Sequence, residues 1–442
     1  MSGTKLIMNF EVTPTSHGLA DYRARGGYAT LAKVLREMRP EDVTKEVAAS
    51  GILGHGGAAF PAGRKWGVIR LNDGVPHYLC SNADEGEPGT IKDRWILEHA
   101  PHLLIESMTI AAYALQVRHA FIYIRGEFDL PWRRIAGAVE EAYAAGLLGE
   151  GIAGSDFALD LIVYRGAGSY VCGEASGLLT SLEGRKGYPR NRPPRLTVRG
   201  LYQRPTVVNN VETLANVTGI VRDGAAAFRK IGTAKSPGTQ LISISGHVQR
   251  PGVYEVEYGY SFAKFIREDC GGVLGGLGLK CVVPGGISTK VLTAADIEPL
   301  TLDHASVAAA GSGLGSGGMV VVAEGTCMVR FLQVLVRFYH HESCGQCTPC
   351  REGMGWMHRI VDRIVAGKGE LEDIDRLLAI SKANDGTTIC GMGDAAGYAT
   401  VGILAKYRDE FEHWIVNGRS RYDGRLEAIG AEWTAPEAAL HG

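Results

Sequence analysis

Three cysteines stand close together in the last quarter of the chain, in the segment Glu342-Ser-Cys-Gly-Gln-Cys-Thr-Pro-Cys-Arg-Glu-Gly353, and Cys390 follows 40 residues after the third. Two C-x2-C spacings place three thiolates at one corner of a short loop, which Pro349 keeps tight. Three close thiolates and one remote thiolate suit a [4Fe-4S] cluster, in which each iron takes one cysteine. The sequence therefore predicts a cluster held by Cys344, Cys347, Cys350 and Cys390.

Structural zinc is the alternative to a cluster at this run. Zinc sites usually draw a pair of Cys or His ligands from each of two knuckles, whereas the split here is three plus one. The total of nine cysteines is odd, which argues against a disulfide framework. We expect the five scattered cysteines to be buried, inert thiols, namely Cys80, Cys172, Cys270, Cys281 and Cys327.

The composition is that of an ordinary globular protein, with 45% hydrophobic and 21% charged residues and a net charge of −2 over 442 residues. It excludes a collagenous, coiled-coil or wholly disordered chain, and it offers no basic signature for nucleic-acid binding. Glycine is in excess, with 60 residues, which indicates tight turns and close approaches of backbone to ligand. No apolar run reaches the ~20 residues that span a bilayer. The N-terminus lacks a signal-peptide pattern. We expect a cytoplasmic protein, with a peripheral seat on a membrane complex as an option.

Four segments differ in pattern. Residues 1–62 form a polar, helical lead-in that ends in a glycine-rich loop. Residues 63–233 alternate short strands and helices, which predicts a layered α/β domain. Residues 234–325 contain a hairpin and further short strands, which predicts a small α+β domain. Residues 326–442 carry four amphipathic segments with short connections, which predicts a helical bundle.

The glycine-rich loop Gly54-His-Gly-Gly-Ala-Ala-Phe60 is followed by Arg64 and Lys65. Glycines let backbone N–H groups approach an anionic ligand, and the basic side chains add charge. The competing interpretation is a loop that needs glycine only for steric reasons.

A second polar segment, Ser81 to Gly89, follows a predicted strand and carries four polar side chains: Asn82, Asp84, Glu85 and Glu87. Ligands of open α/β sheets bind at this carboxyl end of the strands. Turn formation and capping of the helix that follows is the alternative.

Two further segments stand out: Gly166 to Ser176, which follows a predicted strand, and Val208 to Thr213. Neither is the G-x-G-x-x-G of an ordinary dinucleotide site, but the second leads into a helix whose N-terminus favours an anion. Gly313 to Gly318 matches that motif by letter, yet it precedes an apolar strand, so we reject it. We interpret His55, His77, His99, His102 and His119 as surface or capping residues, because they show no ligand spacing.

These segments, taken in order, resemble the NADH-binding flavoprotein subunit of respiratory complex I along nearly the whole chain. The resemblance is carried by the 54–66 loop, Asn82 to Gly89, Lys92-Asp-Arg94, Gly166 to Glu174, Asn209 to Thr213, Glu342 to Arg351 and Cys390. It implies a multidomain α/β and α+β fold, with a Rossmann-like FMN domain at 63–233, a ubiquitin-like β-grasp domain at 234–325 and a [4Fe-4S] four-helix bundle at 326–442.

The same resemblance implies the site. FMN is expected at Gly54, Gly56, Gly57, Lys65, Asn82, Asp84, Glu85, Tyr170, Gly173, Glu174, Asn209 and Asn210. NADH, the substrate, is expected near Phe60, Glu87 and Arg192, and the four cysteines match the cluster ligands. No catalytic side chain is expected, because hydride transfer from NADH to flavin is cofactor chemistry.

The implied activity is that of the electron-input subunit of NADH:quinone oxidoreductase. A thioredoxin-like [2Fe-2S] subunit and a large multi-cluster subunit are the implied partners, quinone is reached indirectly, and the complex is on the cytoplasmic face of the inner membrane. Two alternatives remain. One is a diaphorase subunit of a soluble NAD-linked hydrogenase or formate dehydrogenase, and the other is a non-catalytic docking scaffold.

Four positions depart from the family pattern. A second glutamate after Glu174 is replaced by Ala175, and the aromatic residue after the Pro-Pro pair is Arg195. The lysine before that pair is Arg192, and an aromatic residue after Trp66 is Val68. A lost carboxylate and a gained cation make the cleft more positive, so it repels a 2′-phosphate less. We expect a preference for NADH that is weaker than is usual in the family.

Overall fold

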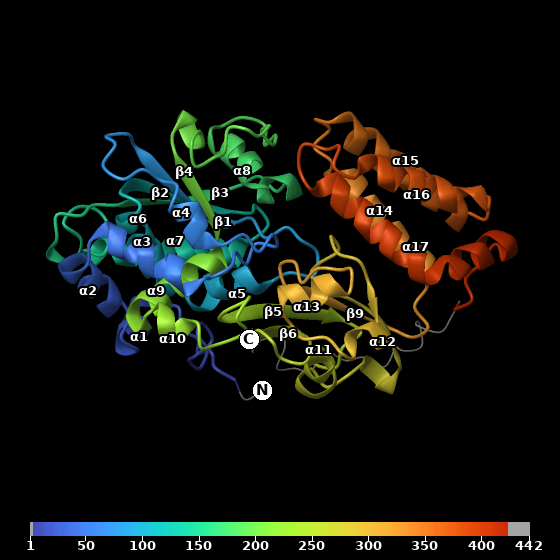
Figure 1. Cartoon of the computed structure of the whole chain (residues 1–442), viewed down its shortest axis with the longest axis horizontal. Helices are drawn as coiled ribbons and strands as arrows, with labels where there is room; N and C mark the ends of the chain where they lie inside the picture. The colour runs from blue at the N-terminus through green and yellow to red at the C-terminus, as the bar shows by residue number, and fades with distance from the viewer. Residues whose placement is uncertain (1–2, 423–442) are drawn as a thin grey trace.

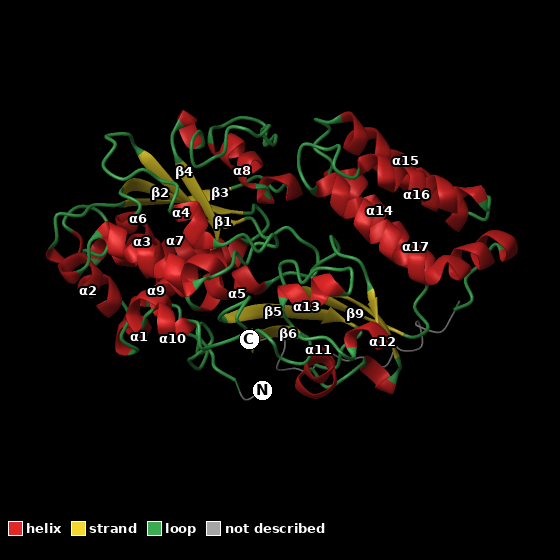
Figure 2. Ribbon diagram, viewed as in Figure 1, coloured by secondary structure: helices red, strands yellow, loops and turns green. Residues whose placement is uncertain are grey.

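A computed structural model describes residues 3–422 of the chain. Two bodies built on β-sheets lie side by side, and a helical bundle formed by the C-terminal part of the chain stands beside both (Figure 1). The secondary structure confirms the multidomain α/β and α+β fold class (Figure 2). The exact domain boundaries stay a prediction, and the part of the predicted bundle from 423 to 442 lies outside the described residues.

The first sheet has four parallel strands in the order β3-β2-β1-β4. They are β1 (His77–Ala83), β2 (Val117–Ile124), β3 (Asp160–Arg165) and β4 (Thr206–Asn210). The chain adds β2 and β3 on one side of β1 and then returns to place β4 on the other side. The strand order therefore reverses between β1 and β4, and ligands of such sheets bind outside the carboxyl ends of the strands at that point.

Helices pack on this sheet, and its central strand β1 is buried along most of its length, whereas the edge strand β3 is partly exposed. The connecting helices are α5 (Lys92–His99), α6 (Pro101–Ala114), α7 (Asp129–Ala144), α8 (Ala175–Leu182), α9 (Val211–Asp223) and α10 (Ala225–Phe228). The N-terminal helices are α1 (Leu19–Ala24), α2 (Ala29–Glu37), α3 (Pro40–Ser50) and α4 (Ala62–Trp66). Leu31 and Val43 from these helices share one core with Leu79 of β1.

Three histidines expected at the surface or at caps are buried instead. His55 is 1% exposed, His77 4% and His102 1%. Each finds a partner far along the chain: His55 faces the carbonyl of Thr239, His77 that of Leu115, and the ring of His102 lies 2.8 Å from the Tyr28 hydroxyl. The prediction was wrong because these partners cannot be read from local spacing.

The second sheet is mixed, with the strand order β6-β5-β9-β7-β8. Its strands are β5 (Thr239–Gly246), β6 (Gly252–Glu257), β7 (Leu279–Val283), β8 (Leu292–Thr293) and β9 (Gly318–Ala323). β5 and β6 form the expected antiparallel hairpin, and β9 pairs parallel to β5. Short helices complete the unit: α11 (Phe262–Lys264), α12 (Ala294–Ile297) and α13 (His304–Ala309). The Ser261 hydroxyl caps α11.

The bundle contains the four predicted helices, α14 (Met328–Glu342), α15 (Thr348–Val365), α16 (Glu372–Asn384) and α17 (Met392–Asn417). Their apolar faces meet in one core that includes Leu332, Met357 and Phe411. A buried ion pair between Lys280 of β7 and Glu410 of α17 ties the bundle to the second sheet. Among residues 3–422, no helix is long and apolar enough to cross a membrane.

Candidate functional site

The loop that follows β1 meets the turn before α8. Asn82 donates its amide N–H to the carbonyl of Gly173 (2.8 Å), and its Oδ1 accepts the backbone N–H of Asp84 (3.1 Å). The Asp84 side chain is buried, and burial raises its pKa to about 7, although Arg125 acts in the opposite direction. Three of the residues predicted to hold the flavin phosphate or ring therefore lie together at the carboxyl edge of the sheet.

Glu85 has a different role in this loop. Its two carboxylate oxygens accept the backbone N–H groups of Asp93 (2.8 Å) and Arg94 (2.9 Å), at the start of α5. Burial and the charge of Asp93 raise the pKa of Glu85 to about 8. Glu85 therefore caps α5, as the alternative interpretation of this segment expects. The contact of Glu85 with FMN stays a prediction.

Glu87 links the first sheet domain to the second. Its carboxylate accepts the hydroxyl of Tyr170 (2.6 Å) and both the backbone N–H and the hydroxyl of Ser288, which follows β7. Burial raises the pKa of Glu87, and these hydrogen bonds counteract that rise. The backbone N–H of Tyr170 in turn donates to Glu342, two residues before the first cysteine of the run. Tyr170 therefore connects the predicted flavin site to the cysteine loop.

The glycine-rich loop passes over the end of β4. A Cβ at Gly56 would lie 3.3 Å from Cβ of Asn210, and Gly57 adopts φ +106°, which favours glycine. Lys65 donates to the carbonyl of Val208 (2.7 Å), and burial together with the charge of Arg192 lowers the pKa of Lys65 to about 8. Trp66 donates its indole N–H to Asn209 (3.0 Å). The loop and the β4 end, predicted from separate segments, are adjacent.

Glu174 caps α8, because its carboxylate accepts the backbone N–H groups of Ser176 and Gly177. The same carboxylate pairs with Arg192 at 2.5 Å. Phe60, predicted to lie near NADH, is 46% exposed, and Arg64 is above its ring at 5.8 Å. The cation at 192 is thus already paired with a carboxylate.

Lys92 is a residue whose role the sequence analysis left unassigned. Its side chain is fully buried, with Nζ 2.7 Å from Asp93 and 2.9 Å from Glu212. Asn210 donates to Asp93 (2.5 Å) and lies 3.3 Å from Nζ. Lys92 and Glu212 belong to segments that carry the family resemblance. A lysine beside carboxylates in these segments is the sequence feature that could have predicted the ion pairs.

The four predicted cluster ligands gather at one end of the bundle. Cys350 lies in the first turn of α15, Cys344 and Cys347 precede that helix, and Cys390 precedes α17. Burial raises the pKa of Cys390 to about 11, with the charges of Cys350 and Cys344 adding to the effect. The charges of Cys347 and Cys344 act in the same way on Cys350, so the four thiols are neighbours. Four thiolates are the donor set that a [4Fe-4S] cluster requires. Within the described part of the chain, no group of three or more His, Cys, Asp or Glu side chains, the four cysteines included, is arranged so that it could hold a metal ion.

The cysteine loop also packs against the first sheet domain. Cys344 and Cys390 contact a buried cluster that includes Val171 and Cys172, in the turn before α8. The rings of Tyr170 and Phe338 meet edge to face at 5.2 Å between centroids. The predicted cluster site is therefore next to the predicted flavin site.

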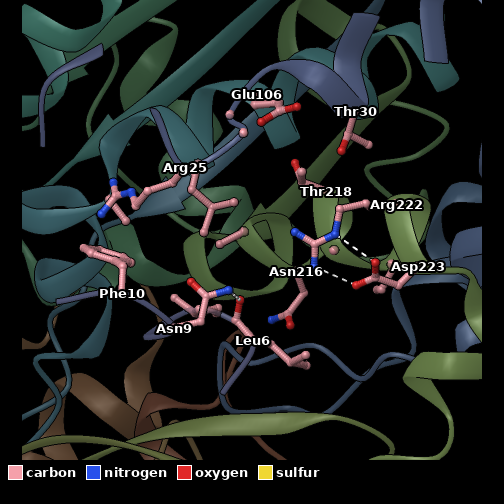
Figure 3. Close-up of a pocket in the computed structure, with 18 of the residues that line it drawn as sticks. Leu6, Asn9, Phe10, Arg25, Thr30, Glu106, Asn216, Thr218, Arg222 and Asp223 are labelled. Carbon is pink, nitrogen blue, oxygen red and sulfur yellow. Dashed lines mark hydrogen bonds and ion pairs between the residues drawn. The ribbon is translucent and has the colours of Figure 1, made fainter. Parts of the chain in front are cut away.

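A cavity of about 140 Å³ lies elsewhere, between the N-terminal segment, α6 and α9 (Figure 3). Arg222 and Asp223 pair at its edge, and Asn216 and Thr218 line it. Drug-sized ligands and cofactors need roughly 300–1,000 Å³, so this cavity is too small for FMN.

Comparison with known proteins places the chain among relatives. The family model of the Nuo51 FMN-binding domain matches residues 47–219, that of the SLBB domain 240–322, and that of the NADH-ubiquinone oxidoreductase-F iron-sulfur binding region 330–414. The F 2 subunit of the NADH-quinone oxidoreductase of Rhizobium meliloti is 47% identical over 92% of this chain and 96% of its own length. The F subunit of the Mycobacterium tuberculosis enzyme is 47% identical over 96% of both chains. The chain belongs to the family of NADH-quinone oxidoreductase F subunits.

Solved structures of related proteins are also similar. A chain of an NAD+-reducing [NiFe]-hydrogenase in the H2-reduced state superimposes with a TM-score of 0.80 and 33% identity, over 90% of this chain and 67% of the hydrogenase chain. Family membership confirms the predicted cofactors, FMN and a [4Fe-4S] cluster, with NADH as substrate. It also implies that other subunits join the chain in a complex.

Proposed function

We propose that this chain is the electron-input subunit of an NADH:quinone oxidoreductase of the complex I type. It oxidises NADH at FMN and passes electrons through its [4Fe-4S] cluster to partner subunits. The observation that carries the proposal is the contact of the Tyr170–Glu174 turn, at the predicted flavin site, with Cys344, Cys390 and Glu342 of the cysteine loops.

FMN would bind at the carboxyl ends of β1 and β4, where the strand order reverses. The glycine-rich loop and Lys65 supply backbone N–H groups and a cation for the phosphate. Amides, a carboxyl group and the turn before α8 supply the remaining polar contacts. The proposed contacts are Gly54, Gly56, Gly57, Lys65, Asn82, Asp84, Glu85, Tyr170, Gly173, Glu174, Asn209 and Asn210.

NADH would bind over the flavin, with Phe60, Glu87 and Arg192 around it. FMN, held by these residues, would supply a hydride acceptor that is also a one-electron donor. The side chains of the protein bind and orient the nucleotide, and the four cysteines would hold the cluster that receives the electrons.

The proposed partners are a thioredoxin-like [2Fe-2S] subunit and a large multi-cluster subunit, through which electrons reach quinone indirectly. The proposed location is peripheral, on the cytoplasmic face of the inner membrane. No basic patch for nucleic acid is needed for this role.

The purified protein, prepared without oxygen, tests the proposal. It should show flavin absorbance and a broad brown iron–sulfur absorbance, carry about four irons per chain, and bleach on addition of NADH. It should also reduce ferricyanide with NADH. A colourless chain with one zinc, or a chain without NADH-dependent ferricyanide reduction, would contradict the proposal, and the second result would favour the non-catalytic scaffold.

A diaphorase subunit of an NAD-linked hydrogenase is the second candidate, favoured by the structural similarity to the [NiFe]-hydrogenase chain. The lengths favour the first candidate, because this chain covers 96% of the R. meliloti F 2 subunit and only 67% of the hydrogenase chain. Purification of the native complex decides between them: a membrane-associated complex that reduces quinone supports the first candidate, and a complex with hydrogenase or formate dehydrogenase activity supports the second.

A further inference from the structure

The carboxylate of Glu87 has three hydrogen-bond donors around it, and Ser288 supplies two of them. The backbone N–H of Ser288 lies 2.8 Å from Oε1, and its hydroxyl lies 2.7 Å from Oε1 and 2.8 Å from Oε2. The Tyr170 hydroxyl donates to Oε2 at 2.6 Å. Ser288 is 201 residues away in the chain, in the second sheet domain.

The loop that carries Ser288 is shaped around Glu87. Gly286 adopts φ +90°, and a Cβ at this position would lie 2.3 Å from Cγ of Glu87. Thr289 closes the turn, because its hydroxyl accepts the Gly285 N–H and donates to the Gly286 carbonyl. This close approach leaves the Ser288 hydroxyl little freedom to turn away from the carboxylate.

The hydroxyl of Ser288 is also where three parts of the molecule meet. Tyr170, in the turn before α8, lies 3.2 Å from it, and Tyr339 of α14 donates to it at 3.4 Å. One side chain of the second sheet domain thus contacts the first sheet domain and the bundle together.

A carboxylate offers about four acceptor positions. The Ser288 N–H, the single Ser288 hydroxyl proton and the Tyr170 hydroxyl proton fill three of them. One position therefore remains for a hydroxyl group of a ligand, and its direction is fixed by the other three donors. Because the Glu87 carboxylate is already held in place, it binds a ligand hydroxyl with little loss of side-chain entropy.

We propose that Ser288 is a positioning residue for nucleotide binding: it fixes the Glu87 carboxylate so that one oxygen lone pair is presented to a ribose hydroxyl of NADH. The inference rests on the proposed function, and it adds the second sheet domain to the nucleotide site. Because Ser288 acts on the binding of substrate and not on hydride transfer, its loss affects KM and leaves kcat unchanged.

The test uses Ser288→Ala in the holoenzyme, with Ser288→Thr as the variant that keeps a hydroxyl and Ser312→Ala as the control. Ser312 lies in the same domain and donates to the Lys290 carbonyl. We expect Ser288→Ala to raise KM for NADH, and the Kd for NAD+ measured by calorimetry on the oxidised protein, by about tenfold. The kcat should stay within about twofold of the wild-type value. Ser288→Thr and Ser312→Ala should behave as the wild type.

A double-mutant cycle with Glu87→Gln separates positioning from packing. If Ser288 acts through Glu87, Ser288→Ala adds little to the KM of Glu87→Gln. Unchanged Kd and KM in Ser288→Ala, fully additive effects in the cycle, or loss of FMN or of the fold in Ser288→Ala would each overturn the proposal. If the wild-type protein itself failed to bind NAD+ and to oxidise NADH, the proposed function would fail instead.

Discussion

At the scale of single residues, the polar groups of the candidate site differ in how they are held. The carboxylates of Glu85, Glu87 and Glu174 accept hydrogen bonds from donors of the protein itself, and that of Glu87 keeps one acceptor position open. Burial raises the pKa of the Asp84 carboxyl to about 7, against the opposing effect of Arg125. Buried carboxyl groups without a strong partner titrate at higher pH, so Asp84 is one of the residues, with Glu85 and Lys65, at which pH acts on the site.

Asp84→Asn should change how stability depends on pH. The pKa of Asp84 is raised to about 7 in the folded protein, so the folded state binds the proton more tightly than the unfolded state. The stabilisation is present at low pH and is lost as pH rises through 7. Between pH 5.5 and 8 the wild type should lose about 2 kcal/mol through this group, and Asp84→Asn should lose none of it. Thermal unfolding of both proteins at the two pH values measures the difference. Parallel curves would contradict the prediction.

Arg195 should govern how well the cleft tolerates a 2′-phosphate. Arg192 is paired with Glu174, whereas no ion pair involves Arg195 in the part of the chain that the structure describes. We expect NADH to be preferred over NADPH, and Arg195→Gln to lower kcat/KM for NADPH about fivefold while the value for NADH stays within about twofold. Arg118→Gln, at the amino end of β2, is the control. Comparable kcat/KM for NADH and NADPH in the wild type would refute the preference.

At the scale of elements, a buried charge network joins α5, α9 and the end of β4. Lys92 is the cation between Asp93 and Glu212, and the Asn210 side chain donates to the Asp93 carboxylate. The Leu241 N–H of β5 donates to Glu212, which connects the network to the second sheet. The network therefore fixes a predicted FMN contact, Asn210, relative to both sheets.

Lys92→Met should destabilise the protein by about 3–5 kcal/mol, because it leaves buried carboxylates without their cation. Thermal unfolding followed by circular dichroism measures the loss, and Lys33→Met on the exposed face of α2 is the control. Adding Glu212→Gln should recover part of the stability, since it removes one of the uncompensated charges. A shift equal to that of the control would mean that the network contributes little.

The secondary structure could be predicted well from the sequence. Three of the four parallel strands, β1, β2 and β3, are short apolar runs, and the bundle helices show a clear period of 3.6 residues, because both signals are local. The difference between Glu85 and Glu87 could not be predicted. It depends on where α5 begins and on Ser288, 201 residues further along. The buried histidines escaped prediction for the same reason.

At the scale of the whole molecule, the proposed electron route crosses from the first sheet domain into the bundle. The step from one to the other runs past the Tyr170–Phe338 contact and the loop that begins at Glu342. Oxidation of NADH and transfer of electrons to the cluster therefore depend on different parts of the chain. A substitution that impairs one step should leave the other step unchanged.

Cys344→Ser should abolish electron transfer to quinone or to a protein acceptor, because the cluster loses a thiolate ligand. Reduction of flavin by NADH should survive, with a change in its rate of less than about threefold, since no cysteine takes part in hydride transfer. Iron content and the absorbance change on NADH addition are the measurements. Cys327→Ser, outside the run, should keep its iron. Loss of flavin reduction in a folded Cys344→Ser protein would show that the two steps are not separable.

The contact of the N-terminus with β6 has a consequence for biosynthesis. The backbone N–H groups of Leu6, Ile7 and Met8 all donate to the buried carboxylate of Glu255, some 249 residues away in sequence. These amides are synthesised before their acceptor, which is translated some 249 residues later. Contacts between such distant segments slow folding. Residues 6–8 therefore gain these hydrogen bonds only after β6 has been synthesised, which couples the last step of folding of the first sheet domain to the second.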